Sequence, residues 1–278
     1  VLPIGFFVKI FFGSKLIYDA HELESLDKLN QIKFSQKSKI TYFLEKMIWK
    51  KIDLFITVSP SILKWYNNNF GNKKNSITVL NSPEIINKKF AKKNSLRKKF
   101  KITNDKLIFV YVGSFQLGRG IQNMLKAFSD PKIKSNLVLI GYGELESEIK
   151  KFSKNNNNIH FSKSVSHELL VQFIKSANVG LCIIEKISLS DYYCLPNKFF
   201  EFAFANLHIL ASDFPDMKRL INTYSLGSYI TPNYNSLIKK IKFFENHIKK
   251  IKIKKKKLVD LGWSSQSKIL IDGYRKII

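Results

Sequence analysis

Nine short strand-like runs alternate with helical segments along most of this 278-residue chain, and this alternation constrains the fold more than any other feature. Strands that alternate with helices pair in parallel, because each helix carries the chain back across the sheet. The sequence therefore predicts an α/β protein with doubly wound parallel sheets. The strand-like runs occupy residues 15–19, 53–58, 77–80, 107–113, 136–141, 158–161, 179–184, 209–212 and 227–230.

A lysine-rich and weakly apolar stretch at residues 87–105 separates three early strands from six later ones, which places a domain boundary there. We expect two Rossmann-like domains, an incomplete first one at residues 1–92 and a second at residues 93–258. Residues 259–278 are expected to form a C-terminal helix that crosses back to the first domain. The apolar run at residues 1–12 is too short to span a bilayer and is predicted to be a core-facing helix. The chain is thus expected to begin inside a domain.

The net charge of +26 raises the question of nucleic-acid binding, but the kind of basic residue argues against it. Only four of the 47 basic residues are arginines. Lysine is poorer than arginine at bidentate recognition of phosphates and bases. We therefore expect a solvated basic surface, no specific nucleic-acid partner, and room for peripheral contact with an anionic membrane. Cys182 and Cys194 are the only cysteines and lack metal-ligand spacing, which indicates a reducing, cytoplasmic compartment.

The segment Pro196–Glu201 lies between two apolar strand-like runs and is predicted to begin a helix. Asn197 can cap this helix, which would open on Lys198 and carry Glu201 in its first turn. The free N–H groups and the dipole at such a helix start attract anions. Lys198 and Glu201 could simply pair along the helix, or Glu201 could bind a ribose and Lys198 a phosphate. Both alternatives stay open at this point.

A glycine-rich turn follows the buried strand at residues 107–113 and contains Gly113, Gly118 and Gly120. Glycines let the backbone approach a phosphate closely, and the guanidinium of Arg119 matches phosphate oxygens. The spacing is not that of the dinucleotide fingerprint, so a plain strand-to-helix connection is the alternative. Placed beside the helix that begins near Lys198, the turn could hold a diphosphate.

His21 follows the first strand and is flanked by Asp19 and Glu22. The carboxyl ends of strands are where α/β proteins place ligand-binding groups, although a lone histidine is more often structural. The sequence contains no metal-ligand spacing, no nucleophile elbow and no Walker loop.

Six motifs occur in order along the chain: Tyr18–Glu22, Thr57–Ser59, Val110–Phe115 with Gly118–Gly120, Leu137–Gly143, Pro196–Glu201 and Ala211–Asp213. Together they resemble the retaining glycosyltransferases of family 4. The resemblance implies the GT-B architecture and transfer of a hexosyl-type sugar from a nucleotide-sugar donor to a glycan or lipid-linked acceptor with retention, as in cell-envelope polysaccharide biosynthesis. It implies no metal or other cofactor. The family has several more strands before residue 18, so the resemblance implies a fragment or a truncated first domain.

The resemblance also assigns roles to individual residues. It implies that Arg119 neutralises the donor diphosphate, that Glu201 holds the ribose, and that His21 lies close to the donor sugar as a third catalytic position. Ser114 stands where many members carry a basic residue, and Tyr193 stands where they carry the first of two paired glutamates. The alternative is a non-catalytic or truncated nucleotide-sugar-binding protein. The remaining donor-binding positions are Gly113, Gly118, Gly120, Pro196, Asn197 and Lys198.

Overall fold

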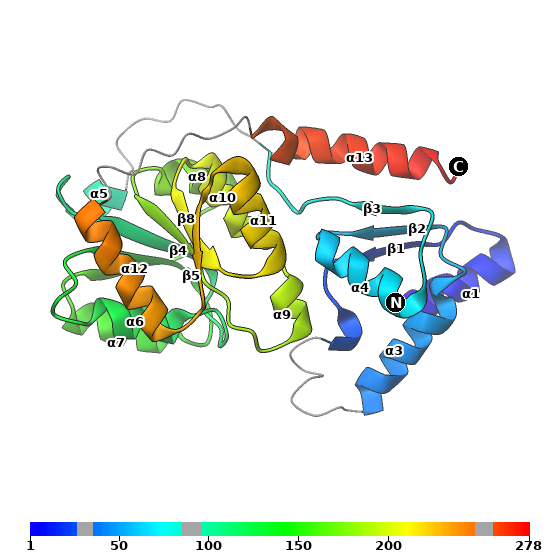
Figure 1. Ribbon diagram of the computed structural model, residues 1–278, viewed down its shortest axis with the longest axis horizontal. Helices are drawn as coiled ribbons and strands as arrows, with labels where there is room; N and C mark the ends of the chain where they lie inside the picture. The colour runs from blue at the N-terminus through cyan, green and yellow to red at the C-terminus, as the bar shows by residue number, and fades with distance from the viewer. Residues whose placement is uncertain (27–35, 85–95, 248–257) are drawn as a thin grey trace. The chain divides into compact units, whose positions relative to one another are not determined.

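The protein is described by a computed structural model, in which two compact units can be distinguished (Figure 1). The first unit takes residues from three parts of the chain, and the second from two. The described residues are 1–26, 36–84, 96–247 and 258–278. The first unit comprises residues 1–84, 186–195 and 259–278, and the second comprises residues 85–185 and 196–258.

The domain prediction and the two units divide the chain differently in one respect. The predicted boundary after residue 92 lies outside the described residues. Residues 186–195, by contrast, belong to the first unit, although they connect a strand and a helix of the second. The C-terminal residues 259–278 also belong to the first unit.

The second unit is built on a parallel sheet of six strands in the order β6-β5-β4-β7-β8-β9. The chain adds β5 and β6 on one side of β4 and then returns to place β7 on its other side. The carboxyl ends of β4 and β7 therefore flank the point where the strand order reverses, which is where α/β sheets bind ligands. The strands are β4 (Ile108–Ser114), β5 (Asn136–Tyr142), β6 (Ile159–Ser162), β7 (Val179–Cys182), β8 (His208–Ser212) and β9 (Gly227–Ile230).

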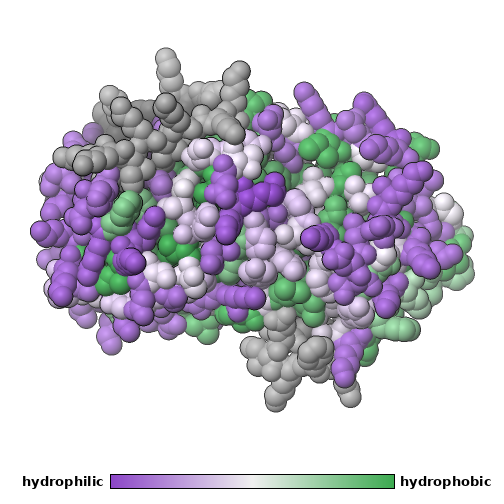
Figure 2. Space-filling model, in the orientation of Figure 1, coloured by the Kyte–Doolittle hydropathy of each residue, from purple (hydrophilic) through white to green (hydrophobic). Residues whose placement is uncertain are grey.

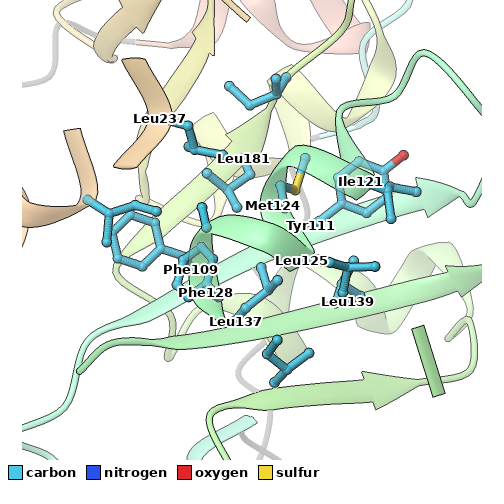
Figure 3. Close-up of a cluster of buried hydrophobic side chains, with 14 of the residues drawn as sticks. Phe109, Tyr111, Ile121, Met124, Leu125, Phe128, Leu137, Leu139, Leu181 and Leu237 are labelled. Atoms are coloured by element: carbon cyan, nitrogen blue, oxygen red, sulfur yellow. The ribbon is translucent and has the colours of Figure 1, made fainter. Parts of the chain in front are cut away.

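Helices cover both faces of this sheet, as its apolar strands require. On one face, α6, α7 and α12 pack against Phe109, Leu137 and Leu181 of the strands (Figure 3). On the other face, Phe202 of α10 packs against Gly180. Helices α8 and α11 lie on this same face, where α8 contacts α10 and α11 contacts β8. The helices are α5 (Leu96–Lys99), α6 (Ile121–Phe128), α7 (Glu146–Asn155), α8 (His167–Ile174), α10 (Asn197–Phe204), α11 (Pro215–Tyr224) and α12 (Tyr234–His247).

The first unit has a parallel sheet of three strands in the order β1-β2-β3. Phe55 on one face packs against Trp49 and Tyr66 of the neighbouring helices, and Leu54 and Ile56 on the other face pack against α13. The elements are α1 (Leu2–Phe12), β1 (Ile17–Ala20), η1 (Glu24–Leu26), α3 (Gln36–Trp49), β2 (Leu54–Thr57), α4 (Pro60–Phe70), β3 (Ser76–Thr78), α9 (Leu189–Tyr193), η4 (Val259–Leu261) and α13 (Trp263–Arg275).

All nine predicted strands are present within a few residues of their predicted ranges, and the α/β class is confirmed. The prediction of a core-facing helix at the start of the chain is only half right. Leu2 and Phe6 of α1 pack against the first unit, but Phe7, Phe11 and Phe12 are 58%, 75% and 81% exposed. The apolar residues encircle this helix, so a single core contact cannot cover them all.

The surface is as polar as the composition suggests. On the face shown in Figure 2, hydrophilic residues are spread over both units, as expected for a chain with 47 basic residues. Among the helices of the described residues, none has the length and apolar content needed to cross a bilayer.

Candidate functional site

The glycine-rich turn between β4 and α6 has backbone angles that residues other than glycine rarely adopt. Gly113 and Gly120 have φ angles of +130° and +69°. A Cβ atom on Gly120 would lie 2.7 Å from Cγ2 of Ile183, at the end of the neighbouring strand β7. Glycine at this position is therefore required both by the backbone angle and by the close approach of two chain segments.

Hydrogen bonds hold the tip of this turn to both neighbouring strand ends. The amide of Glu185, just after β7, donates to the carbonyl oxygen of Gly118 at 2.9 Å. On the other side, the amide of Leu117 donates to Oε1 of Glu144 at 2.9 Å, in the turn that follows β5. The half-buried Arg119 is thus carried by a segment that is anchored on two sides.

Helix α10 begins at the same edge of the sheet, one residue earlier than predicted. Asn197 is the first helical residue rather than the cap, and Pro196 occupies the N-cap without a side-chain hydrogen bond. Proline suits the extended conformation there, and it has no N–H that would need a partner. Glu201 consequently lies in the second turn, not in the first, and is only 5% exposed. The first turn still presents N–H groups to whatever lies beyond the helix end.

Lys198 connects the helix start with the glycine-rich turn. Its Nζ atom would lie 3.6 Å from a Cβ built on Gly113 and lies 3.9 Å from the ring centroid of Tyr111. The phenol group of Tyr111 donates a hydrogen bond to the carbonyl oxygen of Ser114 at 2.8 Å. The two predicted anion-binding segments therefore meet at one end of the second sheet, as the sequence predicts.

The charged groups of these segments share one electrostatic environment. Burial raises the pKa of the Cys182 thiol, at the end of β7, to about 11. Lys198 and Arg119 act in the opposite direction on this pKa, and Glu201 adds to the increase. All three charges are thus felt at a single buried thiol. Lys198 and Arg119 therefore both make the electrostatic potential at this edge of the sheet more positive.

His21 and Tyr193 belong to the first unit, whereas the other predicted site residues belong to the second. His21 is exposed just after β1, and its Nε2 atom lies 3.4 Å from Oδ1 of Asp19. Tyr193 ends α9 and packs against the first unit's core, and its carbonyl oxygen accepts a hydrogen bond from Oγ of Ser59 at 2.9 Å. The nearby amide of Leu23 donates to Oγ of Ser190 at 3.1 Å, which ties the His21 loop to α9.

Two residues of this site were not predicted from the sequence. One is Glu144, in the turn after β5, whose side chain accepts the hydrogen bond from the amide of Leu117. Tyr111 lies in the core-facing register of β4, so only its place two residues before Gly113 could have pointed to a polar role. Within the described parts of the chain, His, Cys, Asp and Glu side chains do not form a group of three that could hold a metal ion.

Comparison with protein families decides the family. Residues 92–257 match the family model described as glycosyl transferases group 1, which is more than half of the chain. The chain belongs to this family. An uncharacterized glycosyltransferase of Methanocaldococcus jannaschii is 28% identical over 188 residues, which are 63% of this chain and 46% of that protein. This member of the group 1 family therefore spans about half the length of that curated relative.

Solved structures share the fold of this group 1 family member. Anabaena HepE in complex with UDP-glucose superposes with a TM-score of 0.70 at 14% identity, over 99% of this chain and 74% of HepE. Sucrose-phosphate synthase from Thermosynechococcus elongatus gives a TM-score of 0.70 at 17% identity, over 99% of this chain and 68% of that one. At such identities the likeness concerns the fold alone, which is the GT-B type with two Rossmann-like units.

Proposed function

We propose that this chain takes part in transfer of a sugar from a nucleotide-sugar donor to a glycan or lipid-linked acceptor, with retention of anomeric configuration as in family 4. The observation that carries the proposal is the meeting of the glycine-rich turn, which contains Arg119, with Lys198 at the start of α10, at the reversal point of the second sheet. Two cations and a helix start suit a diphosphate better than a neutral ligand. HepE was solved with UDP-glucose, so UDP-sugars are the first donors to test.

In the proposed reaction, the bond between the anomeric carbon and the diphosphate oxygen breaks, and negative charge grows on the departing diphosphate. The guanidinium of Arg119, the ammonium of Lys198 and the N–H groups at the start of α10 stabilise that charge. The acceptor hydroxyl forms the new bond to the anomeric carbon on the face from which the diphosphate leaves, and its proton passes to the departing diphosphate oxygen. The proposed reaction needs no metal, because the cationic side chains stabilise the negative charge on the departing diphosphate.

Glu201 would bind the two hydroxyl groups of the donor ribose, since a carboxylate can accept both hydrogen bonds. Glu201 lies three residues after Lys198 on α10, which places it on the same side of the helix as the proposed diphosphate ligand. His21 would lie on the acceptor side, near the transferred sugar. Tyr193 leaves that side without the first glutamate of the family, so the proposed transfer relies more heavily on the second unit.

The proposed setting is the cytoplasmic face of an anionic membrane during synthesis of a cell-envelope polysaccharide. Apolar side chains of α1 are exposed a few residues before the exposed Lys15, and basic residues favour anionic headgroups. Flotation of the chain with vesicles of phosphatidylglycerol, compared with vesicles of phosphatidylcholine, tests this setting. Equal recovery with the two lipids would contradict it.

A thermal-shift panel of nucleotide sugars followed by a product assay tests the proposed function. A donor at a free concentration 100-fold above its Kd should stabilise the folded chain by about 2.7 kcal/mol. A donor that stabilises the chain and also yields a glycosylated product supports transfer. A donor that stabilises it without any product would favour the second candidate, a non-catalytic nucleotide-sugar-binding protein, which retains the same diphosphate site.

A further inference from the structure

We infer that Tyr111 is a positioning residue that fixes the Lys198 ammonium at the diphosphate site and couples the start of α10 to the glycine-rich turn. The inference rests on the proposed function, in which Lys198 binds the donor diphosphate. It concerns a residue whose side chain lies among the core residues of the second unit (Figure 3).

The first step is the placement of the ammonium over the ring. Nζ of Lys198 lies 3.9 Å from the ring centroid of Tyr111, and among cation–ring contacts between described residues the next shortest is Lys186 over Tyr192, at 4.2 Å. An ammonium within about 6 Å of an aromatic face is attracted by the electron density of the ring. Because the Tyr111 ring is 0% exposed, water competes poorly for that face.

The second step is the conformational freedom of lysine. A lysine side chain has four carbon atoms and is flexible, so an ammonium at a binding site loses much freedom when it meets an anion. The buried ring restricts Lys198 before any ligand arrives, because it attracts the ammonium to one place beside Gly113. Such preorganisation lowers the entropic cost of binding.

The third step is the other end of the same side chain. The phenol O–H of Tyr111 donates to the carbonyl oxygen of Ser114 at 2.8 Å, at the point where β4 enters the glycine-rich turn. One buried side chain thus contacts the cation with its ring and the turn with its hydroxyl. Tyrosine offers both groups, whereas phenylalanine lacks the donor and leucine lacks both.

The test is a double-mutant cycle that uses inorganic pyrophosphate and UDP as probes in calorimetric titrations. We expect Tyr111→Leu to weaken pyrophosphate binding about tenfold and Tyr111→Phe, which keeps the ring face, by less than about threefold. Lys198→Met should weaken binding about tenfold, and adding Tyr111→Leu to it should change little further. A purely structural role of Tyr111 predicts losses that multiply.

Phe109→Leu is the matched control, because Phe109 is equally buried, lies two residues earlier on β4 and belongs to the same core cluster. It should lower stability without coupling to Lys198. Losses that multiply in the Tyr111→Leu/Lys198→Met double variant, or an equal loss in Tyr111→Phe and Tyr111→Leu, would overturn the inference. Wild-type chain that does not bind pyrophosphate would overturn it as well. Wild-type chain that binds pyrophosphate with the expected coupling, but no nucleotide sugar, would contradict only the proposed function.

Discussion

The two units contain the same kind of parallel sheet but enclose it to different degrees. The second unit has helices on both faces of six strands, and Phe109, Leu137 and Leu181 in its core are fully buried. The first unit has three strands, and its helix α1 leaves Phe11 and Phe12 largely exposed. The difference indicates that the proposed diphosphate site is held by a self-contained core, whereas His21 depends on a smaller one. Variants that change one unit and leave the other intact test this difference.

The largest expected effect is on the chemistry of the second unit. Arg119→Ala should reduce sugar transfer about a hundredfold, comparable to the loss of one preorganised donor at a site of developing charge. The glycine-rich turn should keep its structure, because its anchoring hydrogen bonds use Gly118 and Leu117. Steady-state kinetics with the donor found by thermal shift measure the effect.

Arg219→Ala is the matched control for this variant. Arg219 lies on α11 of the same unit, where its Nε atom is 3.3 Å from Oδ1 of Asp216. This variant removes the same charge from the unit and should leave turnover within about twofold of wild type, because Arg219 belongs neither to the glycine-rich turn nor to the start of α10. Equal losses for the two arginines would show that net charge, not the turn, matters.

Two glycines with nearly the same backbone angle allow a comparison of stability across the units. Gly120 in the second unit has φ +69°, and Gly13 in the first unit has φ +67°, with nothing within 4 Å of a built Cβ. Gly13→Ala should cost about 1 kcal/mol from the backbone alone. Gly120→Ala should cost about 2 kcal/mol, since its Cβ also meets Ile183. Urea unfolding compares them, and equal costs would argue against the close approach of β7 to the turn.

A smaller effect is expected at the proposed ribose site. Glu201→Gln should raise the donor KM about tenfold with little change in kcat, because a neutral amide is a weaker acceptor for two hydroxyl groups. The control is Glu148→Gln on α7 of the same unit, outside the site. A donor KM unchanged in Glu201→Gln would exclude the ribose role while leaving the diphosphate site intact.

The smallest expected effect is a dependence of the first unit's stability on pH. Burial raises the pKa of Glu45, although Oε1 accepts hydrogen bonds from Tyr18 and Tyr66 at 2.6 and 2.7 Å. A carboxyl with a raised pKa in the folded state binds more protons there than in the unfolded chain. Its contribution to stability is thus complete below the unfolded pKa of about 4.5 and is lost as the pH rises through the folded value.

Glu45→Gln removes this titration, so the stability of wild type relative to the variant should fall from pH 4.5 upward until the folded pKa is passed. Thermal unfolding of both proteins over that range measures the difference, and carboxylates elsewhere cancel in the comparison. A difference that does not change with pH would show that folding does not raise the pKa of Glu45.

The sequence predicted the sheets well because their information is local. Each strand of the second unit is a short apolar run bounded by turn residues, and every predicted strand is found. The start of α10 was predicted to within one residue from Pro196 and Asn197. The meeting of this helix with the glycine-rich turn followed from the rule that parallel strands end at one edge.

What the sequence did not predict depends on tertiary contacts. Helix α9 has five residues, too few to display a helical period, and its assignment to the first unit rests on contacts of Ser190 and Tyr193 with residues more than a hundred positions away. The role of Tyr111 depends on Lys198, 87 positions later in the chain, because a cation over a ring leaves no local pattern. Such long-range pairs become visible only in the folded chain.

Hydrogen exchange of the backbone amides, with and without UDP, tests the central claim most directly. The account predicts that UDP slows exchange in two separate segments, Gly118–Met124 and Lys198–Phe202, because a diphosphate would accept hydrogen bonds from the turn and from the start of α10. Amides of the first unit's sheet should change much less. Slower exchange in only one of these segments, or in neither while UDP is bound, would contradict a diphosphate held jointly by the turn and the helix.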